Sequence, residues 1–229
     1  MPLVVVDTSI SLPATLSPTG LTRKFWVLLA YGALAYREEH LRLELDAIEA
    51  EAGDDGAIGG RDAIESLIGV AARRRAALAE LLPPDAPAGW VAAGSGYLFD
   101  EYERKAIDVG PRLGRAIDRE EAARLRRQLQ AICVAGPEPF APTDAPALTR
   151  DPADDPIVYT ALRVGADLLI SDDRDIVPDR DAGTQPYQHA DSSILAITFG
   201  QLVDEHLHDV DWSAIHGDLL FEAHRQLPD

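Results

Sequence analysis

The sequence contains a single cysteine, Cys133, among 229 residues. One thiol cannot build a disulfide framework or a multi-cysteine zinc site within one chain, so dithiol redox enzymes and zinc fingers are excluded. The six histidines show neither the His-x-x-x-His nor the His-Glu-x-x-His spacing of zinc hydrolases. Gly-x-Gly-x-x-Gly, phosphate-loop and Gly-x-Ser-x-Gly signatures are also absent, which argues against nucleotide-binding doubly wound folds and serine hydrolases.

The chain also lacks a hydrophobic run long enough to span a bilayer. The best candidate, residues 25–35, is too short, and Met1-Pro2-Leu3 lacks the basic residues of a signal peptide. We therefore expect a cytoplasmic protein with no membrane partner. With 46% hydrophobic and 26% charged residues, the chain can bury one sizeable core.

Basic residues are scarce. Lysine and arginine total 21 against 39 aspartates and glutamates, a formal net charge of −18. Such a field repels phosphate backbones, so a bulk electrostatic nucleic-acid binder is disfavoured, and a phosphate substrate would need a local basic patch, a metal or a basic partner. Only Lys24 and Lys105 are lysines, a bias that we attribute to genomic base composition.

The hydrophobic pattern predicts an α/β fold. The runs 3–6 and 168–170 are continuous and apolar, as in strands buried on both faces of a parallel sheet. Shorter strands are expected at 91–93 and 194–197. Helices are expected at 25–43, 63–82 and 97–107, from 118 onwards, at 156–164 and at 199–205. Residues 132–134 form either a further short strand or the end of the helix that begins at 118.

Turn residues divide these elements. Pro13, Pro18 and Gly20 predict a loop after the first strand, and further loops are expected at 49–60 and 136–152. Asp155 is the expected cap of the helix that has Pro156 at its first position, and Gly165 should end this helix. The expected architecture is a three-layer sandwich with a central, mostly parallel sheet. Residues 1–205 would form one domain with a helical hairpin inserted at about 37–90, and 206–229 a C-terminal extension.

Acidic residues follow both clear strands. Asp7 comes directly after the first strand, and Asp172, Asp173 and Asp175 follow the strand at 168–170. Carboxyl ends of parallel strands meet at one edge of a sheet, where ligands bind. Each close pair of carboxylates would repel by about 4 kcal/mol at an effective dielectric of 20, so such a cluster needs a cation or protons. Oxygen ligands in a small site suit Mg²⁺ or Mn²⁺, which support phosphodiester hydrolysis.

Four segments of the sequence resemble the PIN-domain nucleases, which include the VapC-like ribonuclease toxins. They are Val-Val-Val-Asp-Thr-Ser at 4–9, Ser-Gly-Tyr-Leu-Phe-Asp-Glu-Tyr-Glu at 95–103, Arg-Asp-Pro-Ala-Asp-Asp-Pro at 150–156, and Leu-Leu-Ile-Ser-Asp-Asp-Arg-Asp-Ile at 168–176. The third segment is the closest match. Residues 194–202 also look like the family's closing strand and helix.

The resemblance implies a Mg²⁺- or Mn²⁺-dependent endoribonuclease of a toxin–antitoxin pair, in which a metal-activated water hydrolyses RNA, with single-stranded DNA as another substrate. It further implies a homodimer and a cognate antitoxin protein. Carried over residue by residue, it assigns the catalytic and metal-binding acids as Asp7, Glu101, Asp154 and Asp173, with Ser9, Ser171 and Asp175 in support. The span from Asp7 to Glu101, 101 − 7 = 94 positions, is long for the family, and we assign the excess to the helical hairpin.

The residues leave alternatives open at each position. An aspartate after a strand, such as Asp7, is often only a turn or helix cap. Asp100 or Glu103 could replace Glu101 as the second acid if the helix phase differs. Asp155 is an alternative to Asp154 as the third acid, and Asp172 or Asp175 to Asp173 as the fourth. The arginines at 73–75 and at 124, 126 and 127 are more simply solvated helix faces than a nucleic-acid surface. Two other functions remain as alternatives: a phosphatase with Asp7 as covalent nucleophile, although Ser9 replaces the second aspartate such enzymes use, and a non-catalytic PIN-like binding module.

Overall fold

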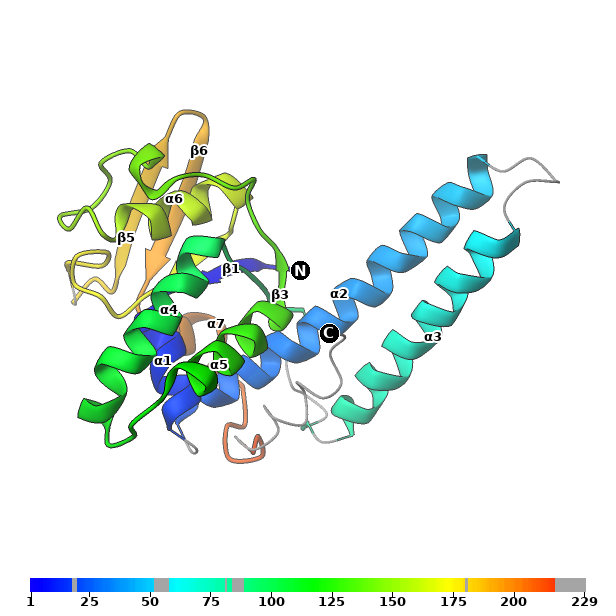
Figure 1. Cartoon of the computed structure of the whole chain (residues 1–229), viewed down its shortest axis with the longest axis horizontal. Coiled ribbons are helices and arrows are strands. Elements are labelled where there is room, and N and C mark those ends of the chain that lie inside the picture. The colour runs from blue at the N-terminus through cyan, green and yellow to red at the C-terminus, as the bar shows by residue number, and fades with distance from the viewer. Residues whose placement is uncertain (18–19, 52–57, 81, 84–88, 180, 217–229) are drawn as a thin grey trace.

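The computed structural model describes residues 1–17, 20–51, 58–80, 82–83, 89–179 and 181–216. A six-stranded sheet in the order β3-β2-β1-β4-β6-β5 forms its centre, and only the edge strand β5 runs antiparallel to its neighbour. The strands are β1 (Leu3–Val6), β2 (Val91–Ala93), β3 (Cys133–Ala135), β4 (Leu168–Ile170), β5 (Thr184–His189) and β6 (Ser192–Ile197). The expected α/β fold with a mostly parallel sheet is therefore confirmed (Figure 1).

Helices cover both faces of the sheet, because the central strands are apolar on both sides. On one face, Val4 and Val6 pack in a core with residues of α1, α2, α5 and α7. On the other, Val5 and Leu169 pack with α6. The bounds are α1 (Thr8–Leu16), α2 (Leu21–Glu51), α3 (Ile58–Ala79), α4 (Gly96–Val109), α5 (Arg119–Ile132), α6 (Asp155–Val164) and α7 (Phe199–His206), with 3₁₀ turns at Gly110–Leu113 and Pro142–Asp144.

The loop predicted from Pro13 is wrong, because α1 begins directly after Asp7 and contains this proline. Proline removes one backbone donor, which would otherwise bond to the carbonyl four residues earlier. The helix tolerates this loss with other bonds around it: Ser11 Oγ donates to the Asp7 carbonyl over 3.0 Å, and Thr15 Oγ1 donates to the Leu12 carbonyl over 3.0 Å. The chain therefore turns into a helix at the very residue that carries the first carboxylate.

Helices α2 and α3 pair as a hairpin that projects from the body of the molecule (Figure 1). The predicted helical pair is present, but α2 begins in the core: Phe25, Leu28 and Leu29 are fully buried before the helix leaves the sheet. Glu38 is buried between the two helices and forms ion pairs with Arg42 and Arg75. Of the loop predicted at 49–60, residues 49–51 and 58–60 are helical, and residues 52–57 lie outside the described part.

The hairpin joins the sheet at an unusually close contact. A Cβ atom placed on Gly32 of α2 would lie 1.8 Å from the Trp90 carbonyl oxygen, just before β2. Trp90 also packs edge-on against Phe25, with ring centroids 6.4 Å apart. Glycine at position 32 therefore sets how near this helix can come to the strand.

Sequence patterns missed β5, a polar strand that carries Pro186. It pairs antiparallel with β6 at the edge of the sheet, which is where a strand tolerates proline. After α7, Leu207 and Ile215 are buried in the main core, so the first part of the expected C-terminal extension belongs to the domain. Residues 217–229 lie outside the described residues. None of the helices in the described residues is both long and apolar enough to cross a membrane.

Candidate metal centre

Asp7 lies at the carboxyl end of β1, at the start of α1, and is 1% exposed. Its Oδ2 accepts hydrogen bonds from Ser9 Oγ (2.6 Å) and Ser171 Oγ (2.7 Å). Its Oδ1 accepts from the Thr8 backbone N–H (2.5 Å) and from Thr8 Oγ1 (3.2 Å). Hydrogen bonds from these four donors thus fix the orientation of the carboxylate, and two of them come from Ser9 and Ser171.

Glu101 reaches the same place from α4. Ser95 caps this helix by accepting from the Leu98 N–H, as predicted, and this phase buries Glu101 to 5% exposure. Asp100 and Glu103, the alternatives from the sequence, instead form ion pairs with Arg126. Of the three acids, Glu101 is therefore the one that faces Asp7.

A lysine holds Glu101 in place. Lys105, one turn further along α4, lies 2.9 Å from Glu101 Oε1, and its Nζ donates to Thr8 Oγ1 over 3.0 Å. Thr8 Oγ1 is in turn 3.5 Å from Glu101 Oε2. Burial raises the pKa of Glu101, the Lys105 hydrogen bond and charge lower it, and the Asp7 charge raises it further. The net pKa is above the usual glutamate value.

The segment after β4 wraps around Ser171. The Asp173 N–H donates to Ser171 Oγ over 3.0 Å, and the Asp175 N–H donates to Asp173 Oδ1 over 2.9 Å. Asp172 points elsewhere, because its Oδ1 accepts from the Phe199 N–H at the start of α7. Ser171 therefore joins Asp7 to the Asp173 turn in one hydrogen-bonded network, and Asp172 is tied to α7.

Asp154 lies just before α6 and is 6% exposed. Two hydrogen bonds brace this region against α4: Tyr97 Oη donates to the Ala153 carbonyl over 2.7 Å, and Thr160 Oγ1 donates to Ser95 Oγ over 2.9 Å. Within the described residues, no hydrogen bond or ion pair reaches the Asp154 carboxylate. This buried carboxylate is therefore without a protein partner there.

The prediction that Asp155 caps α6 is wrong by one residue. Asp155 is the first residue of the helix, and Asp154 occupies the cap position without making a capping bond. The Asp155 carboxylate instead accepts from the Leu148 N–H, the Thr149 N–H and Thr149 Oγ1, at 2.7–2.8 Å. Asp155 is used to fix the preceding loop, which leaves Asp154 as the acid that faces the sheet edge.

The surroundings of Asp154 disfavour a negative charge. Burial raises its pKa from 3.8 to about 7, with additions from the charges of Asp173 and Asp7 and a smaller opposing effect of Lys105. Burial contributes most to this rise, and the charges of the neighbouring carboxylates add to it. A divalent cation would supply counter-charge to these carboxylates.

Carboxylate oxygens of Asp151, Asp154 and Asp175 lie within 4.8 Å of one another. Among the described residues, this is the only group of three or more histidine, cysteine or acidic side chains close enough to share a metal ion. Sequence reasoning named Asp154 and Asp175 but missed Asp151, which lies in a proline- and aspartate-rich loop with no periodic pattern. Asp7 and Glu101 are joined through Thr8, and Asp173 joins Asp7 through Ser171. Lys105 was also missed. Its signal was its place one helical turn after Glu101.

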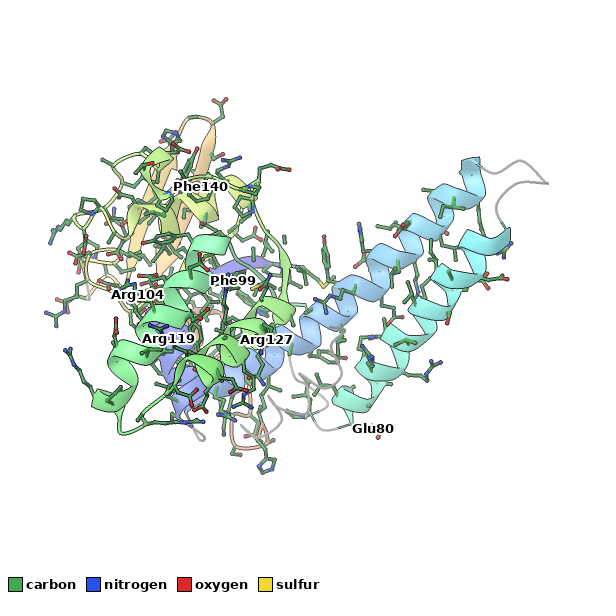
Figure 2. All side chains as sticks on the ribbon, in the orientation of Figure 1. Glu80, Phe99, Arg104, Arg119, Arg127 and Phe140 are labelled. Atoms are coloured by element: carbon green, nitrogen blue, oxygen red, sulfur yellow. The ribbon has the colours of Figure 1, made fainter. Side chains whose placement is uncertain are left out.

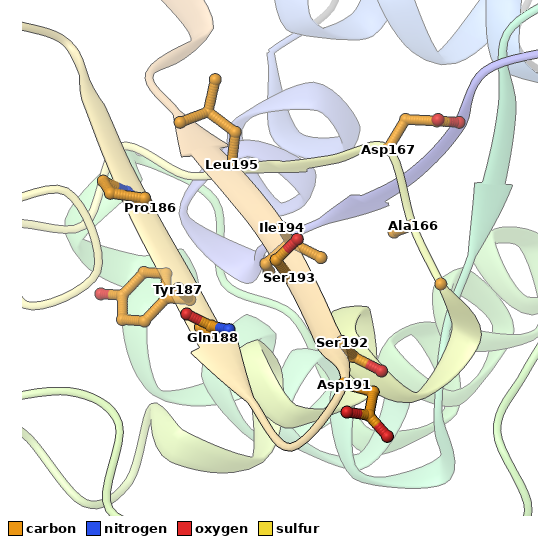
Figure 3. A pocket seen from close by; sticks show the side chains of 11 residues that line it. Ala166, Asp167, Pro186, Tyr187, Gln188, Asp191, Ser192, Ser193, Ile194 and Leu195 are labelled. Atoms are coloured by element: carbon orange, nitrogen blue, oxygen red, sulfur yellow. The ribbon is translucent and has the colours of Figure 1, made fainter.

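Other surfaces carry less chemistry. A hollow of about 890 Å³ lies at the opposite end of the sheet from the acids, between the start of β4 and the β5–β6 hairpin (Figure 3). Its charged residues, Asp167 and Asp191, are both acidic. Arg104, labelled in Figure 2, lies on α4 next to Glu101, and its side chain is 63% exposed at 4.0 Å from that carboxylate.

The donor set fits a hard divalent cation. The possible ligands found at this edge among the described residues are carboxylates and hydroxyls, and Mg²⁺ and Mn²⁺ prefer such oxygen donors. The buried carboxylate of Asp154, with Asp151 and Asp175 beside it, offers the negative charge that such an ion neutralises.

Comparisons of the chain with protein-family models, with curated proteins and with solved structures found no match.

Proposed function

We propose that this protein is a Mg²⁺- or Mn²⁺-dependent phosphodiesterase acting on RNA, built on a PIN-like fold. The observation that carries the proposal is the buried Asp154 carboxylate, which has no partner among the described residues and lies beside Asp151 and Asp175, within electrostatic reach of Asp7 and Asp173. Acids from four segments of the chain meet at the carboxyl edge of a parallel sheet, where α/β proteins bind ligands. The order of these segments along the chain matches the PIN-like pattern that the sequence resembles.

Each group has a definite task in this proposal. Asp154, Asp151 and Asp175 would hold the cation, with Asp173 next to them. The cation supplies positive charge that stabilises the phosphate and lowers the pKa of water. Ser9 and Ser171 would hold the Asp7 carboxylate in a fixed orientation at the same edge, where its negative charge acts on the cation and on the attacking water. Lys105 keeps Glu101 in position.

The test is cleavage of a panel of structured RNA, single-stranded RNA and single-stranded DNA, with Mg²⁺, with Mn²⁺ or with chelator. We expect metal-dependent cutting that the chelator abolishes and that Asp7→Asn loses. Asp100→Asn is the matched control, because Asp100 lies beside Glu101 on α4 but its side chain is 68% exposed and faces Arg126. Equal cutting by wild type and Asp7→Asn would contradict the proposal.

The two alternatives predict different results. A phosphatase with Asp7 as nucleophile needs a free carboxylate oxygen and would trap an aspartyl-phosphate, but both oxygens of Asp7 already accept two hydrogen bonds each. A non-catalytic binding module would bind metal without turnover of any substrate in the panel. Metal binding without cutting, on a panel extended to total cellular RNA, would therefore favour the binding module.

We also propose that the protein is the toxin of a toxin–antitoxin pair and forms a homodimer. The net charge of −18 and the acidic edge support an antitoxin with an arginine-bearing segment that docks there. Purification from the native host should recover a small basic partner in complex with the protein, and the complex should cut RNA more slowly than the free protein. Recovery of the protein alone, fully active, would count against this proposal.

A further inference from the structure

The acids at the sheet edge fall into two groups that differ in what they contact. Both oxygens of Asp7 accept from serine, threonine and backbone donors, and Glu101 accepts from Lys105 and Thr8. In the second group, Asp154 has no partner among the described residues, and its neighbours Asp151 and Asp175 lie within 4.8 Å of it. Both acids of the first half are thus tied to donors, whereas in the second half Asp151 accepts one hydrogen bond, from the Ala153 N–H over 2.9 Å, and Asp154 accepts none among the described residues.

Lys105 is the positive charge of the first half. Its Nζ lies 2.9 Å from Glu101 Oε1 and 3.0 Å from Thr8 Oγ1, and Thr8 Oγ1 is 3.2 Å from Asp7 Oδ1. The side chain is 29% exposed, so the ammonium is partly withdrawn from water. A cation bound between Asp7 and Glu101 would have to share this small space with the ammonium, and the like charges would repel strongly at such distances.

We propose that Lys105 takes the place of a second divalent cation, so that the site binds a single metal ion, held by the Asp154 half. The inference rests on the proposed function, because it assumes that the acids at this edge bind a metal. It adds the number of ions and the residue that sets this number. Lys105 is a positioning residue here: it acts through Glu101 and Thr8, and through the charge that it places beside Asp7.

The residue type agrees with this role. The chain uses arginine for 19 of its 21 basic residues, and one of its two lysines occupies this position. An ammonium is a compact point charge with three donors, so it can lie between two carboxylates as a small cation does. A guanidinium is a planar fork and needs a wider space. Arg104, one residue earlier on the same helix, stays at the surface.

The test is a count of bound ions. Mn²⁺ binding to the full chain is followed by isothermal titration calorimetry and by the loss of the free-ion EPR signal, without any substrate. We expect one Mn²⁺ per wild-type chain, two per chain for Lys105→Met, and one again for the double variant Lys105→Met with Glu101→Gln. Lys105→Arg, which keeps the charge, and Arg104→Met, which removes a charge from the surface, should both bind one. Near-UV circular dichroism checks that each variant is folded.

The outcomes separate the inference from the proposed function. Two ions in the wild type, or one ion in a folded Lys105→Met variant, would overturn the role of Lys105 and leave the metal-dependent nuclease standing. No Mn²⁺ bound to the wild type would overturn the proposed function and the inference with it. Because the wild-type count alone can contradict the inference, it stays testable even if Lys105→Met does not fold.

Discussion

The variant Asp154→Asn should be more stable than the wild type in chelator at pH 8, although it loses metal binding. Asp154 has a pKa raised to about 7 in the folded protein, far above its ordinary value of 3.8. The folded state therefore binds more protons than the unfolded state between about pH 4 and pH 7. Stability falls as the pH rises through this window, and the penalty is fully present above it. Asparagine carries no charge, so the variant escapes the penalty.

The size of the effect follows from the same linkage. A difference of one between the folded and unfolded pKa changes the free energy of unfolding by about 1.4 kcal/mol. For a protein of this length, each kcal/mol changes the Tm by about 2–4 °C. The full displacement would give roughly 4 kcal/mol, but screening by solvent at the open edge of the sheet leaves about a third of it. We therefore expect Asp154→Asn to raise the Tm by about 3–6 °C at pH 8, with a gain that shrinks towards zero near pH 4. Thermal unfolding followed by circular dichroism at several pH values, in chelator, measures this directly.

Metal should reverse the order of the two proteins. Ligand that binds only the folded state stabilises it by mass action, so Mn²⁺ should raise the Tm of the wild type and leave Asp154→Asn almost unchanged. Asp155→Asn is the matched control: Asp155 is equally buried, but its carboxylate accepts three hydrogen bonds. That variant should lose stability at pH 8, by about 1–3 kcal/mol. A loss of stability in Asp154→Asn as well would show that the Asp154 charge is not the cause.

The second large effect is expected at the contact between the hairpin and the sheet. Gly32→Ala would place a Cβ 1.8 Å from the Trp90 carbonyl oxygen and 2.8 Å from its carbonyl carbon. Both atoms belong to the backbone, so neither can turn aside, and α2 would have to move away from the chain before β2. Such overpacking costs about 3 kcal/mol or more. We expect a fall in Tm of about 6–12 °C.

Gly69→Ala on α3 is the control for helix propensity. Its Cβ would meet only the end of the Arg73 side chain, 3.4 Å away. Alanine is the better helix former, so this variant should gain about 0.5–1 kcal/mol. Denaturant unfolding of both variants compares them on one scale. Equal stability of Gly32→Ala and wild type would mean that α2 adapts to the sheet more easily than its packing indicates.

Elements whose local chemistry agrees with their surroundings could be read from the sequence. The runs at 3–6 and 168–170 predicted β1 and β4, because strands buried on both faces need continuous apolar residues. Ser95 predicted the start of α4, and with it the phase that turns Glu101 inward. The missed elements contain proline where sequence rules predict no helix or strand, because tertiary contacts stabilise them there. Pro13 lies inside α1, and Pro186 lies in the polar edge strand β5.

The site was predictable in part for the same reason. Asp7 and Asp173 follow strands, so the topology alone brings them to one edge. Asp151 lies in an irregular loop, and nothing local distinguishes it from Asp144 in the same segment. Lys105 could have been noticed from its spacing to Glu101, since residues four apart on a helix are neighbours. That it faces Asp7 depends on how α4 packs against α1, which is a property of the fold.

The place of β1 in the sheet has a consequence for the order in which the protein matures on the ribosome. This strand is made first, yet it lies between β2 and β4, whose paired residues follow 88 and 164 positions later. Contacts at such separations form late, because the intervening chain must be available before the pairing can stabilise it. A nascent chain therefore carries Asp7 long before Asp154 and Asp173 have been synthesised. The acidic centre can assemble only after Asp173 and Asp175 have emerged, so a nuclease activity of the kind proposed would be withheld from the growing chain until then.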